Sequence, residues 1–328
     1  MFLGVDGGGT KTAYALVDAH GNVRASHVTA SVSHLAAGVD AAAALLQEGM
    51  RATFAAARIA PADVRFAFFG LSSHGEDSSV VAQLDAMPSS LLEPRRYACG
   101  NDMLGSWAGS LACADGISVI AGTGSMAYGE WAGRGARAGG WGELIGDEGS
   151  AYWIAREGFT LFTRMSDGRA PRGPLYELVR RRFSLSADLD LSSHVYGVDA
   201  NTRAAFAQFA RVVHEAAEAG DAAAQGIFTA AARELAALVL AVRRTLAVPD
   251  IVPLPVSWTG GAFSGSARLV EAFRHELASA AVPFEPRTPL LPPVLGAALY
   301  AARLGGAPLG PTSIERLRSQ VANAGLPS

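Results

Sequence analysis

The chain has 328 residues, of which 50% are hydrophobic and 17% are charged, and its net charge is −3. This composition is typical of a globular protein with room for two domains and excludes a disordered chain. A net charge so close to zero does not favour a nucleic-acid partner. The two cysteines, Cys99 and Cys113, predict no disulfide framework, so we expect a cytoplasmic protein.

We expect neither a signal peptide nor a membrane-spanning segment. The first residues lack a basic region and reach Asp6 at once, unlike a signal peptide. The most apolar long stretch, residues 235–248, contains Arg243 and Arg244. We judge this stretch too short and too charged to cross a membrane.

The N-terminal third of the chain predicts alternating strands and helices. Apolar residues predict a strand over 2–5, and a glycine-rich turn separates it from a strand-like segment over 11–17. A second turn signal at 18–22 precedes a third strand from Val23. Further along we expect a helix over 39–57 and a strand over 65–70; residues 94–99 then lead to Asn101-Asp102 and a helix from Met103.

The pattern of strand, Gly/Thr turn and strand then occurs again over 117–131. From about Ala151 the chain is expected to be mostly helical, with Asp221 as the N-cap of an Ala-rich helix. Three elements complete the prediction: a strand over 252–258, a helix over 294–303 opened by Pro292-Pro293, and a last helix with a capping box at Thr312–Glu315.

The first glycine-rich turn consists of Asp6, Gly7, Gly8, Gly9 and Thr10. Consecutive glycines leave backbone N–H groups unobstructed, so the turn can approach a phosphate closely. The Thr10 hydroxyl can donate a hydrogen bond, Lys11 adds a positive charge, and Asp6 can hold Mg²⁺ through water. An ordinary hairpin turn is the alternative that the triplet alone leaves open.

Two other phosphate-binding motifs do not fit. A Walker A loop needs glycine directly before Lys-Ser/Thr, whereas Thr10 precedes Lys11 and a strand follows. Residues 122–127 match a dinucleotide fingerprint formally, but the glycines over 129–142 do not predict the crossover helix that it requires. We therefore interpret the second turn as another phosphate turn; its candidate residues are Gly122, Thr123 and Gly124.

Two further features are candidates for chemistry. Asp102 follows an apolar segment and precedes a helix, so it is either a catalytic base or a helix N-cap. Residues 139–150 form the densest glycine-rich and polar run in the chain. It is either a substrate loop, with Asp147 binding hydroxyl groups, or a long turn whose acidic residues favour a helix N-terminus.

Taken together and in this order, these motifs resemble the actin-like ATPase and sugar-kinase superfamily, and within it the N-acetylglucosamine kinase branch of the BadF/BadG/BcrA/BcrD ATPase family. The two Gly/Thr turns match the two phosphate motifs, and Thr259-Gly260-Gly261 stands at the family's adenosine motif. The segments 140–142 and 146–153 are similar to the amino-sugar kinases.

The resemblance implies an α/β fold of two actin-like, ribonuclease H-like domains with an inter-domain nucleotide and substrate cleft. It implies ATP and Mg²⁺ as cofactors, an amino sugar as substrate, and Asp102 as the base that accepts the proton of the sugar 6-hydroxyl. It implies a homodimer without nucleic-acid or membrane partners. The nucleotide residues would include Gly260, Gly261 and Ser264, and the sugar residues Ser33, His34, Asp102, Gly140, Trp141, Gly142 and Asp147.

The sequence departs from this branch in the first sugar loop. N-acetylglucosamine kinases carry Asn beside His there, whereas this chain has Ser33-His34, and Leu35 replaces an aromatic residue. Glucosamine or another hexose derivative is therefore an alternative substrate. A different alternative is an ATP-driven iron–sulfur activator of a dehydratase or reductase, which would use Cys99 and Cys113.

The motif order also predicts domain boundaries. We expect residues 1–115 to form the N-terminal actin-like domain and 116–310 the C-terminal one. The last helix, within 311–328, is expected to dock on the first domain.

Overall fold

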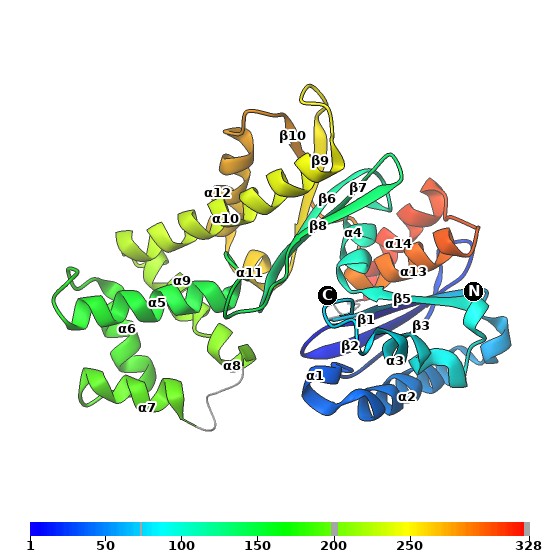
Figure 1. Cartoon of the computed structure of the whole chain (residues 1–328), viewed down its shortest axis with the longest axis horizontal. Helices are drawn as coiled ribbons and strands as arrows, with labels where there is room; N and C mark the ends of the chain where they lie inside the picture. The colour runs from blue at the N-terminus through cyan, green and yellow to red at the C-terminus, as the bar shows by residue number, and fades with distance from the viewer. Residues whose placement is uncertain (73, 198–202, 325–328) are drawn as a thin grey trace. The chain divides into compact units, whose positions relative to one another are not determined.

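The computed structural model describes residues 1–72, 74–197 and 203–324. Its contacts divide the chain into two compact units: residues 1–115 together with 288–328 form unit 1, and residues 116–287 form unit 2. Each unit is built around a five-stranded sheet (Figure 1). The predicted α/β class with two related domains is confirmed.

The sheet of unit 1 has the order β3-β2-β1-β4-β5. Strands β1 (Phe2–Gly7), β2 (Lys11–Val17) and β3 (Val23–Ala30) pair antiparallel, and β4 (Phe66–Leu71) and β5 (Tyr97–Asn101) continue the sheet in parallel with β1. The remaining elements before residue 115 are α1 (His34–Ala37), α2 (Val39–Ala57), η1 (Pro61–Asp63), α3 (Val81–Ala86), η2 (Met87–Ser90), η3 (Pro94–Arg96) and α4 (Met103–Leu111).

Strand β2 shows how the sheet of unit 1 becomes buried on both faces. Successive side chains of a strand point to opposite faces. Tyr14 and Leu16 pack in the cluster that contains Leu46 and Met50 of α2. On the opposite face, Ala13, Ala15 and Val17 pack with residues of the two C-terminal helices, which are Leu295, Leu299 and Leu317. Unit 1 is therefore a helix–sheet–helix sandwich.

These C-terminal helices, α13 (Pro293–Leu304) and α14 (Pro311–Ala324), correct the predicted domain boundary. Residues 288–310 were expected in the second domain, but they belong to unit 1 (Figure 1). Small residues explain the close packing, since a Cβ on Gly296 of α13 would lie 2.6 Å from Gly109 Cα of α4. The last helix also docks on unit 1, where Gln320 Oε1 accepts a hydrogen bond from Val23 N at 3.0 Å.

The capping box predicted for α14 is wrong in position. The helix begins at Pro311, so Thr312 lies inside its first turn. The amides of Ser313 and Ile314 bond instead to the Gly310 carbonyl, at 3.0 and 3.1 Å. Proline at the first helical position is pre-organised for the helix and needs no hydrogen bond, which explains the earlier start.

The sheet of unit 2 has the order β10-β9-β6-β7-β8. Strands β6 (Gly116–Ala121), β7 (Ser125–Trp131) and β8 (Arg134–Gly139) form an antiparallel meander like that of unit 1. Strands β9 (Leu254–Thr259) and β10 (Phe284–Pro286) add in parallel. The repeated strand, turn and strand of the sequence thus opens both sheets.

The rest of unit 2 is mainly helical, as predicted from Ala151 onward. Helix α10 carries the N-cap predicted at Asp221, whose carboxylate accepts hydrogen bonds from Ala223 N and Ala224 N. The elements are α5 (Ala151–Ser166), α6 (Pro174–Phe183), η4 (Asp188–Asp190), α7 (Leu191–Tyr196), α8 (Arg203–Ala207), α9 (Ala210–Glu218), α10 (Ala222–Leu246), α11 (Gly261–Ser264) and α12 (Ala267–Ala278).

Helix α10 also corrects the statement that the most apolar stretch is too short for a membrane. With 25 residues it is long enough and apolar enough to cross one by length and composition. Within unit 2, however, Leu235, Val239 and Val242 pack with Ile117 and other strand residues in one buried cluster. A core helix passes the same test, and that is the role this helix has in the fold.

Candidate active site

The carboxyl ends of three neighbouring strands in unit 1 bring the predicted site residues together. The register pairs Asp6 of β1 with Gly70 of β4, and Gly70 with Gly100 of β5. Asp102 follows β5 directly, and a Cβ added to Gly70 would lie 3.1 Å from Asp102 Cα. The parallel strands therefore place Asp6 and Asp102 at the same edge.

The first glycine turn, which joins β1 to β2, is tied to the loop that contains Ser33. The Ser31 hydroxyl donates to the Gly8 carbonyl at 2.7 Å, and Ser33 N donates to that same hydroxyl at 3.1 Å. On the other side of the turn, Ser72 N donates to the Gly7 carbonyl at 2.8 Å. The phosphate turn and the first candidate sugar loop thus form one connected surface.

Asp102 occupies the N-cap position directly before α4 but makes no capping hydrogen bond with its side chain. Asn101 Oδ1 accepts the hydrogen bond from Met103 N at 3.1 Å instead. This division of roles leaves the Asp102 carboxylate available for chemistry, which favours the base over the N-cap interpretation.

Burial of the two aspartates raises both pKa values. Desolvation raises the pKa of Asp102 to about 7, and the negative charges of Asp6 and Glu76 contribute, although the amides of Met103 and Asp102 act in the opposite direction. Desolvation also raises the pKa of Asp6 to about 6, against the effect of Lys11. A carboxylate with a pKa near 7 is well suited to general-base catalysis at neutral pH.

Asp6 also fits the kind of metal site predicted for it. The described residues contain no group of three or more His, Cys, Asp or Glu side chains that could hold a metal ion. Mg²⁺ is usually held by one or two carboxylates, with water and substrate phosphates as the other ligands. Asp6 supplies one carboxylate beside the glycine turn that is the candidate phosphate site, and this fits that kind of site.

The second phosphate turn lies in unit 2 between β6 and β7. Gly122 N bonds to Gly124 O at 2.9 Å, and Ala151 N at the start of α5 bonds to Gly122 O at 2.9 Å. The second candidate sugar loop closes on the same turn, because Gly140 N donates to the Ser125 carbonyl at 3.0 Å. This turn and the loop over 139–150 are thus one structural element.

Asp147 joins the two parts of that element. Its side chain is 2% exposed, and its Oδ1 accepts a hydrogen bond from Ser125 N at 3.1 Å. Its backbone has a φ of +57°, a left-handed conformation that aspartate tolerates better than most residues. The other carboxylate oxygen pairs with Arg203, a residue that the sequence did not single out.

The predicted adenosine motif follows β9 in unit 2. Gly260 has a φ of +102°, and a Cβ there would lie 2.5 Å from the Ala121 carbonyl oxygen and 2.9 Å from Gly122 N. Only glycine allows this approach, so Gly260 lies directly against the second phosphate turn. Gly261 begins α11, which contains Ser264.

The tip of the second sugar loop is exposed. The side chain of Trp141 is 71% exposed, and those of Leu144 and Ile145 are 86% and 77% exposed. Gly142 adopts a φ of +86° in the same loop. Large apolar side chains in this position are available to contact a ligand.

A sequence comparison decides the family. The signature of the BadF/BadG/BcrA/BcrD ATPase family matches residues 3–301. The chain belongs to this family. The match covers both phosphate turns, Asp102, the second sugar loop and the adenosine motif, so the resemblance inferred from the motifs is confirmed.

Two kinases are similar to this protein over much of the chain. An N-acetyl-D-glucosamine kinase from Dictyostelium discoideum is 28% identical over 270 residues, which is 80% of this chain and 85% of that protein. An N-acetylmuramic acid/N-acetylglucosamine kinase from Clostridium acetobutylicum is 34% identical over 205 residues, or 62% of this chain and 65% of that protein.

Solved structures agree on the fold. A candidate N-acetylglucosamine kinase from Chromobacterium violaceum is 25% identical, with a TM-score of 0.70 over 91% of this chain and 97% of that one. A ROK family glucokinase from Streptomyces griseus, crystallised with glucose and AMPPNP, is 16% identical, with a TM-score of 0.53 over 92% of this chain and 99% of that one. The second likeness shows a shared sugar-kinase fold only.

Proposed function

We propose that this protein is an ATP-dependent amino-sugar kinase that transfers the γ-phosphate of ATP to the 6-hydroxyl of N-acetylglucosamine. The observation that carries the proposal is the position of Asp102, a carboxylate with a pKa raised to about 7 beside the first phosphate turn. The family membership and the kinase activities of the relatives support the same reaction.

In this proposal Asp102 accepts the proton of the sugar 6-hydroxyl while the hydroxyl oxygen attacks the γ-phosphorus and ADP leaves. General-base catalysis of this kind contributes roughly 10²–10⁴-fold to the rate. In unit 1 the amides of Gly7–Thr10 are the candidates for binding phosphate oxygens. In unit 2 the candidates are the amides of Thr123 and Gly124 for phosphate, and Gly260 with Gly261 for the adenosine. When bound, Mg²⁺ neutralises charge on the phosphates.

The Mg²⁺ dependence should vary with pH, because Asp6 must be ionised to hold the ion. The pKa of Asp6 is about 6, so its affinity for Mg²⁺ should fall as the pH drops through that value. We expect the Mg²⁺ concentration for half-maximal activity to rise between pH 7.5 and 5.5, and to be less pH-dependent in Asp6→Asn. A titration with the same slope in both proteins would contradict this role for Asp6.

Each unit contains one loop that is a candidate for binding the sugar. Ser33 and His34 lie in the loop tied to the first phosphate turn, and Trp141, Gly142 and Asp147 lie in the loop tied to the second. An ionised carboxylate offers about four lone-pair sites, so Asp147 keeps acceptor capacity for a sugar hydroxyl beside its contacts with Ser125 and Arg203.

Ser33 should influence the choice between N-acetylated and free amino sugars. A serine hydroxyl reaches less far than an asparagine amide, so Ser33→Asn should increase the ratio of kcat/KM for N-acetylglucosamine over glucosamine. Hydrogen-bond discrimination of this kind corresponds to roughly tenfold. The ratio is measured by ADP release with each sugar. An unchanged ratio would show that Ser33 does not contact the substituent on carbon 2 of the sugar, and glucosamine would then remain as the competing substrate.

The iron–sulfur activator is less well supported by the cysteines. Neither Cys99 nor Cys113 forms a disulfide. Burial raises the pKa of the Cys99 thiol well above its usual range, whereas a cluster ligand must be a thiolate. Protein purified without oxygen should therefore be colourless.

We also propose a cytoplasmic homodimer, because the reaction consumes ATP and the sequence motifs resemble enzymes of that kind; sedimentation velocity tests the dimer.

A further inference from the structure

Asp147 carries a charge that the protein has taken out of solvent. One carboxylate oxygen is held by Ser125 N, and the side chain is 2% exposed. A buried carboxylate is costly unless it is paired with a cation and hydrogen-bonded. The residue that supplies this pairing therefore influences both the turn and the loop that Asp147 joins.

That residue is Arg203, the first residue of α8, which lies 56 positions further along the chain. Its guanidinium group pairs with the second oxygen of Asp147, and its Nε contacts Glu143 Oε2 at 3.0 Å. Arginine suits such a bridge because its planar group offers several donors in a fixed geometry. Arg203 thus connects two carboxylates of the candidate sugar loop over 139–150, namely those of Glu143 and Asp147.

The pair of charges also packs on the second phosphate turn. A Cβ added to Gly124 would lie 2.8 Å from Asp147 Oδ2 and would collide with the guanidinium group of Arg203. Glycine at this position of the turn therefore leaves the space in which the ion pair lies.

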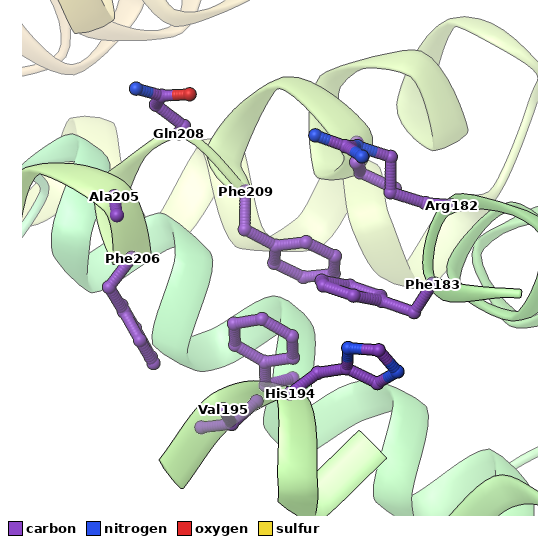
Figure 2. Close-up of a pocket in the computed structure, with 10 residues that line it drawn as sticks. Arg182, Phe183, His194, Val195, Ala205, Phe206, Gln208 and Phe209 are labelled. Carbon is purple, nitrogen blue, oxygen red and sulfur yellow. The ribbon is translucent and has the colours of Figure 1, made fainter. Parts of the chain in front are cut away.

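Helix α8 has a second attachment to the same turn. Phe206 stacks on Tyr152 with ring centroids 4.5 Å apart, and Tyr152 N bonds to the Thr123 carbonyl at 3.4 Å. Phe206 also borders a cavity of about 210 Å³ lined by Phe183, Phe209 and other side chains of the helical part of unit 2 (Figure 2). An aromatic cluster thus holds α8, so Arg203 projects from a supported position.

We propose that Arg203 is a positioning residue for the kinase reaction: by bridging Asp147 and Glu143 it fixes the second phosphate turn and the second sugar loop in their binding geometry. This inference rests on the proposed kinase function. Arg203 itself touches no reacting atom; it acts through Asp147.

The electrostatics give this role a specific signature. Burial raises the pKa of Asp147, the Ser125 amide and Arg203 lower it, and Glu143 raises it. Removing the positive charge of Arg203 must raise the pKa of Asp147 further, so that its carboxylate is lost at a higher pH. Removing the negative charge of Glu143 must have the opposite effect.

The test compares wild type, Arg203→Ala, Asp147→Asn and the double variant in a coupled ADP-release assay. We expect Arg203→Ala to raise KM for ATP and for N-acetylglucosamine by roughly tenfold or more, with a smaller change in kcat, because a buried charge loses its partner. In the Asp147→Asn background the same substitution should change little. Arg203→Lys keeps the positive charge but not the planar group with several donors, so it should raise the KM values less than Arg203→Ala does.

The pH dependence of kcat/KM separates this role from a merely structural one. At each pH, kcat/KM of the wild type is divided by that of Asp147→Asn, and the ratio follows the ionisation of Asp147 with Arg203 present. Dividing kcat/KM of Arg203→Ala by that of the double variant follows the same ionisation without Arg203. Asp6 and Asp102 are the same in all four proteins and cancel. We expect the midpoint of the pH dependence of this ratio to lie at higher pH without Arg203 and at lower pH in Glu143→Gln.

Arg181→Ala is the matched control, since Arg181 pairs with Glu215 at 3.3 Å on the surface of unit 2, where the two side chains are 73% and 60% exposed. It should leave both KM values unchanged. Three results would each overturn the proposal. They are unchanged KM values in Arg203→Ala, an equal effect of Arg203→Ala in the wild-type and Asp147→Asn backgrounds, and a pH midpoint that does not move when Arg203 is removed. If no sugar stimulates ADP release by the wild type, the kinase function fails instead, and calorimetric binding of ADP to the same variants tests Arg203.

Discussion

Asp102→Asn is expected to lower kcat by roughly 10²–10⁴-fold while ATP still binds, because asparagine keeps the shape of the side chain but cannot accept the proton. Sugar-dependent ADP release gives kcat, and calorimetry with ATP gives the affinity. Glu48→Gln, which neutralises an exposed carboxylate of α2 in the same unit, is the control and should retain full activity.

The pH profile gives an independent check on Asp102. A base acts only when ionised, and the pKa of this carboxyl is about 7, so kcat/KM of the wild type should fall as the pH drops through 7. Asp6→Asn removes one of the negative charges that raise this pKa, so the acidic limb should move to lower pH in that variant. Near-normal turnover in Asp102→Asn, or an acidic limb that Asp6→Asn leaves in place, would remove Asp102 as the base.

Gly260→Ala should have the second large effect, and it should act on stability and nucleotide binding together. The φ of +102° is a conformation that alanine adopts only with strain, and the added Cβ would meet the backbone of Ala121 and Gly122. Strain and overpacking each cost about 1–3 kcal/mol. We therefore expect a melting temperature lower by roughly 5–20 °C and a weaker affinity for ATP.

Gly226→Ala is the control for this substitution. Gly226 lies within α10, no atom lies within 4 Å of the Cβ that would be added, and alanine is favoured over glycine in a helix. The control should melt at the same or a higher temperature, measured by differential scanning calorimetry. Equal melting curves and equal ATP affinities for wild type and Gly260→Ala would contradict the close contact between β9 and the second turn.

The sequence predicted most of the elements that have strong periodicity or clear turn chemistry. The segments 11–17 and 39–57 coincide with β2 and α2, and the strand expected over 65–70 differs from β4 by one residue at each end. Alternating apolar side chains and capping residues are local signals, so the sequence contains them directly. The repeated Gly/Thr turn was visible for the same reason.

Strands with little hydrophobic pattern were not predicted. Strand β8 has the sequence Arg-Gly-Ala-Arg-Ala-Gly, and β10 has three residues, and both lie at an edge of their sheet. An edge strand is defined by its hydrogen-bonding neighbour more than by its own side chains. The assignment of α13 to unit 1 likewise depends on close packing with α4, a long-range contact that no local pattern encodes.

The candidate site shows the same division. Asp102 and both glycine turns could be named from motifs, because phosphate binding and helix starts require particular residues at particular positions. Arg203 could not, since nothing in its neighbourhood distinguishes it and its partners lie about 60 residues earlier. Ion pairs between distant segments become visible only in the folded chain.

The central claim is that this chain phosphorylates an amino sugar with ATP. A coupled ADP-release screen over N-acetylglucosamine, glucosamine, N-acetylmannosamine, glucose and muramic-acid derivatives tests it most directly, with the product analysed by phosphorus NMR. We predict the highest kcat/KM for N-acetylglucosamine, with the phosphate on the 6-oxygen. ADP release that no sugar stimulates, or a product phosphorylated elsewhere, would contradict the claim.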